Sequence, residues 1–171
     1  MDRRVASFLD HARRELAAGR PGRAEGLERQ AMLAAESLPD GREERAAVLV
    51  LRTERLIAQG EYSAALTATV QARPLVTAPE PSFALRMDEA RLRLLLGDDG
   101  VRALIEGIVA DGVAGGRASW PMARAYGLLG RACERDGDGR AAREARARGR
   151  RLLSATPDPP RALVEALEEP G

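Results

Sequence analysis

Histidine and cysteine, two residue types that often carry catalysis, each occur once in this chain. No serine, cysteine or carboxylate pattern of a known hydrolytic or metal-binding kind surrounds His11, and we interpret it as a partly exposed helix residue. Cys133 stands on the apolar side of a predicted helix, which favours buried packing over a reactive thiol. A lone cysteine also excludes an intramolecular disulfide and a cysteine-based metal site. The sequence therefore predicts no enzyme, no metal and no cofactor.

Two acidic, glycine-containing segments, 97–100 and 136–139, resemble ion-binding loops only superficially. They read Gly-Asp-Asp-Gly and Asp-Gly-Asp-Gly. Neither has the length or the closing Glu of a calcium loop, and neither has the Gly-Lys-Ser/Thr of a nucleotide loop. Both are typical of turns that cap the following helix.

Arginine is the residue type whose chemistry stands out, and it is concentrated in segment 140–151. One interpretation is a solvated helix face, because Glu144 can pair with Arg140 and Arg148 at a spacing of four residues. The other is contact with phosphates or with an acidic partner. The low aromatic content favours the first, since single-strand binding usually uses aromatic stacking. The arginines of this segment are Arg140, Arg143, Arg146, Arg148, Arg150 and Arg151.

Composition favours an all-α fold without a dominant charge. The 171 residues are 44% apolar but only 3% aromatic, so the core must be built from Ala, Leu and Val, which suits close contact between helices. The 27 basic and 26 acidic residues leave a net charge of +1, which argues against a dedicated nucleic-acid binder. Lysine and asparagine are absent, a bias typical of GC-rich bacterial genomes.

The chain start and its hydropathy predict a cytoplasmic protein. Charged residues follow Met1, but no apolar run of the length of a signal peptide comes after them. No stretch approaches the 18 or so uninterrupted apolar residues of a membrane helix. The single cysteine agrees with a reducing compartment.

The elements that carry these residues are predicted to be helical hairpins. In segment 46–72 two apolar patterns of helical period meet at a Gly-Glu-Tyr turn with no room for a strand. Similar turn glycines recur at positions 19, 60, 97 and 137, and the intervals between them are 41, 37 and 40 residues. Alanine follows at the fifth and twelfth positions after the first two glycines, as Ala24, Ala31, Ala65 and Ala72.

We predict helix pairs at about 3–37, 41–77, 82–112 and 119–155, with a final short helix at 159–169. Asp40 with Glu43, Ser82, and Asp98 or Asp99 are the expected helix caps within this scheme. The third pair matches less well. Arg102 stands where the first small residue is expected, unless Gly100 is an insertion and Ala103 takes that role. The fourth pair keeps Ala142 but has Gly149 at the second position.

Gly60, Glu61, Tyr62, Ala65 and Ala72 resemble the turn and second helix of a tetratricopeptide repeat. The intervals exceed the standard repeat of about 34 residues. The chain is therefore similar to the long-helix arrays of large bacterial signalling ATPases, kinases and transcription activators of the maltose-regulator type. This resemblance implies an all-α, right-handed α-solenoid of about four antiparallel helix pairs in one domain, closed by the C-terminal helix. A three- or four-helix bundle with accidental spacing is the structural alternative.

The resemblance also implies a binding surface, because the first helix of each pair lines a concave groove in this family. Six residues before each turn glycine stand Arg13, Glu54, Arg91 and Arg131, and Arg124 and Arg135 share the face of Arg131. Such a basic groove with one acid suits an acidic peptide, since arginine pairs with carboxylates through two nitrogens. The alternative is that Glu54, Asp88 and Glu89 neutralise these arginines within the protein. The absence of lysine and asparagine from the groove argues against binding of chaperone tails.

By this resemblance the chain is expected to be a non-catalytic protein–protein interaction scaffold of a bacterial signalling or regulatory system. Its partner would be a protein or an acidic peptide, with no membrane contact. The alternative function is that of a transcriptional-regulator fragment that contacts nucleic acid through helix 140–151. An apolar face on the first or last helix could also join two copies as a homo-dimer.

Overall fold

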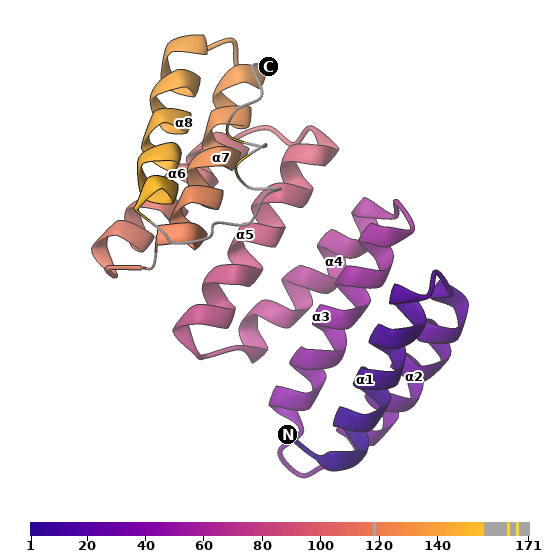
Figure 1. Cartoon of the computed structure of the whole chain (residues 1–171). Coiled ribbons are helices and arrows are strands. Elements are labelled where there is room, and N and C mark those ends of the chain that lie inside the picture. Colours follow the sequence, from indigo (N-terminus) through magenta and orange to yellow (C-terminus); the bar gives the residue numbers. More distant parts are fainter. Residues whose placement is uncertain (118, 156–163, 165–166, 168–171) are drawn as a thin grey trace. The chain divides into compact units, whose positions relative to one another are not determined.

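The computed structural model describes residues 1–117, 119–155, 164 and 167, and all regular structure in that part of the chain is helical (Figure 1). The chain divides into two compact units, Met1–Leu96 and Gly97–Gly171, here called unit 1 and unit 2. The prediction of an all-α protein is confirmed. Its helices are α1 (Arg3–Ala17), α2 (Pro21–Glu36), α3 (Arg42–Ala58), α4 (Tyr62–Ala72), the 3-10 turn η1 (Arg73–Leu75), α5 (Pro79–Leu96), α6 (Val101–Ala114), α7 (Ser119–Arg135) and α8 (Gly139–Ser154).

Unit 1 is a row of helices in which each one packs on the next along the chain. Contacts join α1 to α2, α2 to α3, α3 to α4 and α4 to α5, and α1 also reaches α3. Small residues make this close packing: Ala24 and Ala31 of α2 are fully buried among larger side chains of α1 and α3. The predicted pairs 3–37 and 41–77 are thus antiparallel helix hairpins. The core of the first pair comprises Val5, Leu9, Ala12, Ala24, Ala31, Ala34, Ala35, Val48 and Leu51.

The evenly spaced turn glycines perform the same task at the end of each first helix. At the central hairpin, Gly60 has a φ of +76°, a left-handed conformation that closes the helix. Its N–H donates to the carbonyl of Ile57, and the N–H of Glu61 donates to Leu56. Gly19, Gly97 and Gly137 share this conformation, with φ between 70° and 77°. The periodicity read from the sequence is therefore a repeated backbone feature.

The start of α3 differs from the prediction. No side chain caps this helix, so the capping box of Asp40 and Glu43 is wrong. The preceding residue, Gly41, is buried against the end of α2, and a Cβ there would lie 2.0 Å from the carbonyl oxygen of Ala35. Glu44 faces the chain terminus, where it accepts a hydrogen bond of 2.8 Å from the backbone N–H of Asp2. Close backbone packing, which the residue types do not reveal, fixes this junction.

Prolines shape the junction between α4 and α5. The α-helix ends at Ala72 and continues as the 3-10 turn that contains Pro74, as predicted. Helix α5, however, begins at Pro79, so Ser82 is not its cap. Pro79 and Pro81 fit in the first turn because the N–H groups there have no partner within the helix.

In unit 2, α6 packs on α7 and α7 packs on α8. Gly100 precedes α6 with a φ of +73° and no side chain caps the helix, so the prediction that Asp98 or Asp99 caps it is wrong. The prediction that Ala103 takes the place of the first small residue is also wrong, since Ala103 is exposed. Counted from Gly100, the fifth and twelfth positions are Ile105 and Gly112, and both are buried. The three-residue extension of this turn therefore shifts the phase of the repeat.

At α8 the prediction of a capping turn is confirmed. The carboxylate of Asp138 accepts a 3.0 Å hydrogen bond from the backbone N–H of Ala141. That bond and the Arg102 guanidinium hold the pKa of Asp138 below its usual value. Segment 136–139 thus ends one helix and begins the next, as expected of a turn.

The predicted C-terminal helix 159–169 falls largely outside the described residues. Leu167 is described and is fully buried with Ala123 of α7 and Leu153 of α8. A Cβ on Gly149 would lie 2.9 Å from its Cδ2 atom. Glycine at the second small-residue position of this pair therefore makes room for Leu167.

Candidate functional site

The predicted groove residues lie on the first helices of their pairs. In unit 1, Arg13 is on α1, Glu54 on α3 and Arg91 on α5. Unit 2 holds the other three, Arg124, Arg131 and Arg135, all on α7. A groove that joins all six residues stays a prediction, and each unit is considered by itself.

In unit 1, α3 and α5 enclose a hollow of about 270 Å³ that brings Glu54 and Arg91 together. Asp88 lies on the same wall as Arg91, one turn earlier in α5. The hollow is lined by Val50, Thr53, Glu54, Ile57, Leu85, Asp88 and Arg91. Two carboxylates therefore accompany the arginine in this part of the predicted groove.

Glu54 has an unusual environment for an exposed carboxylate. Loss of hydration against the surrounding walls raises its pKa above the ordinary value of 4.5. The positive charge of Arg13 opposes this change, and the negative charge of Asp88 adds to it. Arg13 also approaches Asp10, with 3.8 Å between nitrogen and oxygen. The pKa of Glu54 on α3 thus depends on the charges of Arg13 on α1 and Asp88 on α5.

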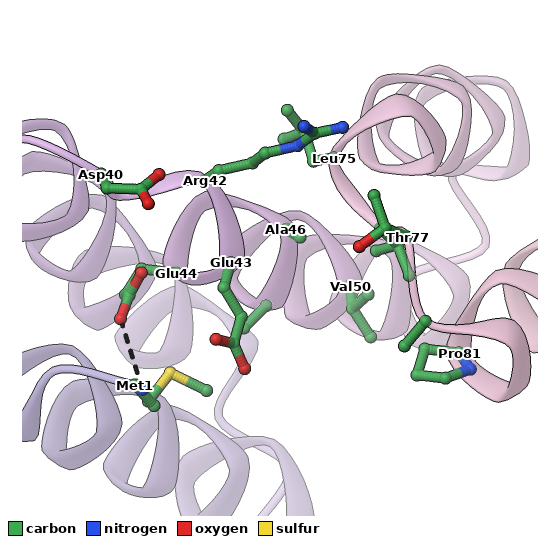
Figure 2. Close-up of a pocket in the computed structure, with 13 residues that line it drawn as sticks. Met1, Asp40, Arg42, Glu43, Glu44, Ala46, Val50, Leu75, Thr77 and Pro81 are labelled. Atoms are coloured by element: carbon green, nitrogen blue, oxygen red, sulfur yellow. Dashed lines mark ion pairs between the residues drawn. The ribbon is translucent and has the colours of Figure 1, made fainter.

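A larger hollow of about 730 Å³ shares one lining residue, Val50, with the first one. Figure 2 shows Ala46 and Val50 of α3 on one side, Thr77 and Pro81 at the other, and the carboxylate of Glu43 between α3 and the chain terminus. We call the two hollows together the α3–α5 groove. It is lined further by Met1, Asp40, Arg42, Glu44, Ala47, Leu75, Val76 and Ala78.

Sequence reasoning missed the apolar floor of this groove. Val50 stands one helical turn before Glu54 and Ala46 one turn before that, so all three share a face of α3. The same spacing rule that grouped the arginines of α7 would have found them. The residues from η1 to Pro81 had no such signal, because only the fold brings them to α3.

Buried ion pairs hold the walls of the groove in place. Glu28 of α2 is almost completely buried and accepts hydrogen bonds from Arg52 (2.5 Å) and Arg55 (2.9 Å) of α3. Glu89 of α5 is buried in the same way, with Arg73 at 2.6 Å and Arg93 at 3.0 Å. Glu89 thus has partners other than Arg91.

The α7 arginines have different surroundings. Arg135 donates a hydrogen bond of 2.8 Å to the carbonyl of Asp98 and lies 3.8 Å from the carboxylate of Asp136, so it braces two turns of unit 2. Arg124 is half-buried, while Arg131 is exposed. Arg131 and Arg135 are thus both exposed, and Arg135 already has partners within unit 2.

The arginine-rich helix α8 is divided between the interior and the surface. Arg146 is buried and pairs with Glu134 of α7. Arg140 pairs with Glu144 at 3.1 Å, which confirms that part of the predicted pairing pattern. Arg148 and Arg151 are exposed and border a hollow with residues of α6 and α7.

The two residues considered for catalysis are separate from these features. His11 is exposed on α1, and Cys133 is buried in α7, where burial raises the pKa of the thiol against the opposing effect of Arg102. In the part of the chain that the structure describes, no three His, Cys, Asp or Glu side chains gather as metal ligands would. No described helix combines the length and apolarity needed to span a membrane.

Consecutive antiparallel helix pairs, left-handed glycine turns and small residues at the helix contacts define a tetratricopeptide-repeat-like fold. The chain is similar to a solved structure of MamA, a tetratricopeptide-repeat protein, in the form described as the RS-1 ArsTM double mutant. The TM-score is 0.64 at 22% identity, and the match covers 91% of this chain and 79% of the other. No protein-family model and no curated protein sequence matches the chain. At this identity the likeness establishes the fold.

Proposed function

We propose that the chain is a non-catalytic interaction scaffold that binds a segment of a partner protein in the α3–α5 groove. One observation carries this proposal: two hollows, of about 730 and 270 Å³, share the lining residue Val50, and both combine apolar residues of α3 with charged side chains. Pockets of this size accept several side chains. The helical-pair fold supports the proposal, and so does the resemblance to bacterial signalling arrays, which suggests a signalling or regulatory setting in the cytoplasm.

The groove lining indicates what such a segment would contain. Ala46, Val50 and Ile57 offer apolar contact along α3, and Glu43 lies toward one end. At the other end Glu54 and Arg91 face the same hollow. A segment with apolar anchors, a basic residue near Glu43 and charges of both signs near Arg91 fits this lining. An entirely acidic peptide would need the arginines of α7 as well.

The test is a selection of random peptides displayed on phage against the full chain. Selected peptides are then labelled, and their affinity for purified variants is measured by fluorescence anisotropy. Val50→Arg places a charged side chain on the groove floor and should weaken binding by tenfold or more, about 1.4 kcal/mol. Leu33→Arg makes the same kind of change on the exposed face of α2 and should leave the affinity within about twofold.

Equal affinity for Val50→Arg and the wild-type chain would reject the groove as the site. Charge reversal of Arg91 and Arg131 in one chain examines the longer arginine surface predicted from the sequence. If that surface contributes, the double variant weakens the selected peptides beyond the effect of Arg91→Glu alone. Circular dichroism of each variant confirms that the helices are retained.

A further inference from the structure

Unit 2 has a hollow of its own, of about 330 Å³, where the end of α6, the start of α7 and the end of α8 meet. Its apolar wall comes from Val113 of α6, Met122 and Tyr126 of α7, and Leu152 of α8. Val113 is 62% exposed, a high value for a branched apolar side chain beside a cavity. The hollow therefore presents apolar surface that no described element covers.

One aromatic residue, Tyr126, belongs to the described lining of this hollow. Tyr126 is buried in the wall of the hollow, and Trp120, the single tryptophan, is 48% exposed in the first turn of α7 but is not among the lining residues. Tryptophan, tyrosine and arginine are the residue types that contribute most binding energy at protein interfaces. Of these types, Tyr126 and the arginines Arg117, Arg148 and Arg151 line the hollow, a composition that suits a protein-binding surface.

The charged residues of this lining all have the same sign. Arg148 and Arg151 of α8 stand three residues apart, so they share a helix face, and Arg117 approaches from the link before α7. Among the described residues, no Asp or Glu belongs to the lining. Within the described part of the chain Arg148 and Arg151 have no carboxylate partner, whereas Arg140 and Arg146 of the same helix each have one.

We propose that this pocket, here called the arginine-bordered pocket, binds an acidic segment of a partner protein. One large apolar side chain of the segment enters the hollow between Val113 and Leu152, and carboxylates on either side of it pair with Arg148 and Arg151. Arginine favours carboxylates because its planar group donates two parallel hydrogen bonds. The pocket is separate from the α3–α5 groove of unit 1, so this proposal goes beyond the function proposed above.

The proposal is tested with peptide arrays probed by the labelled full-length chain. In one array a single Leu, Phe or Trp stands between Glu or Asp residues at varied spacing, and in a matched array Gln and Asn replace the acids. The strongest acidic peptide containing Leu or Phe is then titrated in solution, with the fluorescence of Trp120 as the readout. We expect binding to the acidic array, with an affinity at least about tenfold above that of its neutral counterpart.

Two double variants then locate the site. Arg148→Glu with Arg151→Glu should weaken the acidic peptide by about tenfold or more. Arg140→Glu with Arg143→Glu makes the same change in net charge about two turns away on the same helix and should have less than about a twofold effect. Val113→Asp should also weaken binding, because it places a charge at the apolar wall.

Several results would overturn the proposal. These are equal binding of acidic and neutral peptides, equal losses from the two double variants, and the absence of binding to either array. Binding to phosphatidylserine vesicles or single-stranded DNA without binding to the peptides would also overturn it. None of these results bears on the α3–α5 groove, because the Val50→Arg test uses separately selected peptides.

Discussion

Unit 1 and unit 2 are built from the same kind of helix pair, but unit 1 buries mostly carboxylates and the described part of unit 2 buries a guanidinium. In unit 1 three carboxylates are buried, those of Glu28, Glu44 and Glu89, and one guanidinium, that of Arg55, is buried beside Glu28. In unit 2 the buried charge is the guanidinium of Arg146, which pairs with Glu134. A repeated helix pair therefore fixes where helices touch without fixing which charge is enclosed.

The two candidate binding surfaces also differ in the sign of their charged residues. The α3–α5 groove combines Glu43, Glu54 and Asp88 with Arg91, whereas the charged residues in the described lining of the arginine-bordered pocket are all arginines. Two pockets on one short chain would thus select segments of different charge. Under the two proposals above, one chain would bind two partner segments of different charge.

The largest effect expected from this comparison follows the loss of a buried carboxylate. Glu28→Ala leaves the buried guanidinium of Arg55 without its partner and should lower the free energy of unfolding by about 3–5 kcal/mol. Glu134→Ala removes the partner of Arg146, but Glu134 is partly exposed and water can replace it, so we expect a loss of about 1–2 kcal/mol.

Urea denaturation followed by circular dichroism measures both losses. Glu28→Gln serves as a control of similar volume, since its amide oxygen can still accept one hydrogen bond. Equal losses for the two alanine variants would contradict the expectation that the buried Glu28–Arg55 pair contributes more to stability than the partly exposed Glu134–Arg146 pair.

Two crowded glycines give the next effect. Gly41→Ala places a methyl group 2.0 Å from the backbone oxygen of Ala35, which cannot move without shifting a helix, and should cost about 3 kcal/mol. In Gly149→Ala the nearest atom belongs to the side chain of Leu167, which can turn aside, so the cost should be about 1 kcal/mol. Thermal denaturation compares the two variants, and a larger loss at Gly149 would show that Leu167 is held more rigidly than its contacts imply.

The smallest effect concerns the titration of Glu54. Its folded-state pKa is raised, so at pH values just above 4.5 the folded chain binds this proton more tightly than the unfolded chain, and stability falls as the pH rises through that window. Carbon-13 NMR of the carboxyl group should give a midpoint above 4.5. Asp88→Asn should lower this midpoint and Arg13→Ala should raise it. If neither substitution changed the midpoint, Arg13 and Asp88 would not influence the titration of Glu54.

The sequence was most informative where a single residue type determines backbone geometry. The turn glycines and the alanines at helix contacts predicted the hairpins, because left-handed turns and close helix approach each admit few residue types. The caps were harder to predict. Ser82 is a good cap by type, but the first-turn prolines begin α5 earlier, and crowding at Gly41 leaves no place for the side-chain cap expected from Asp40.

The site was predictable only along single helices. Glu54 and Arg91 were found by counting from the turns, and Val50 could have been found from its spacing to Glu54. The pairing of Glu28 with Arg55 joins residues 27 positions apart, and no local pattern predicts it. The arginine-bordered pocket depends likewise on three helices that meet in the fold.

The central claim is that α3 and α5 together hold a partner segment. The most direct measurement is a titration of the nitrogen-15-labelled full chain with a phage-selected peptide, followed by two-dimensional NMR. The account predicts saturable shifts of the backbone signals around Ala46, Val50 and Leu85, with little change around Leu33 on α2. Shifts confined to α2 and the outer side of α4, with α3 and α5 unchanged, would contradict it.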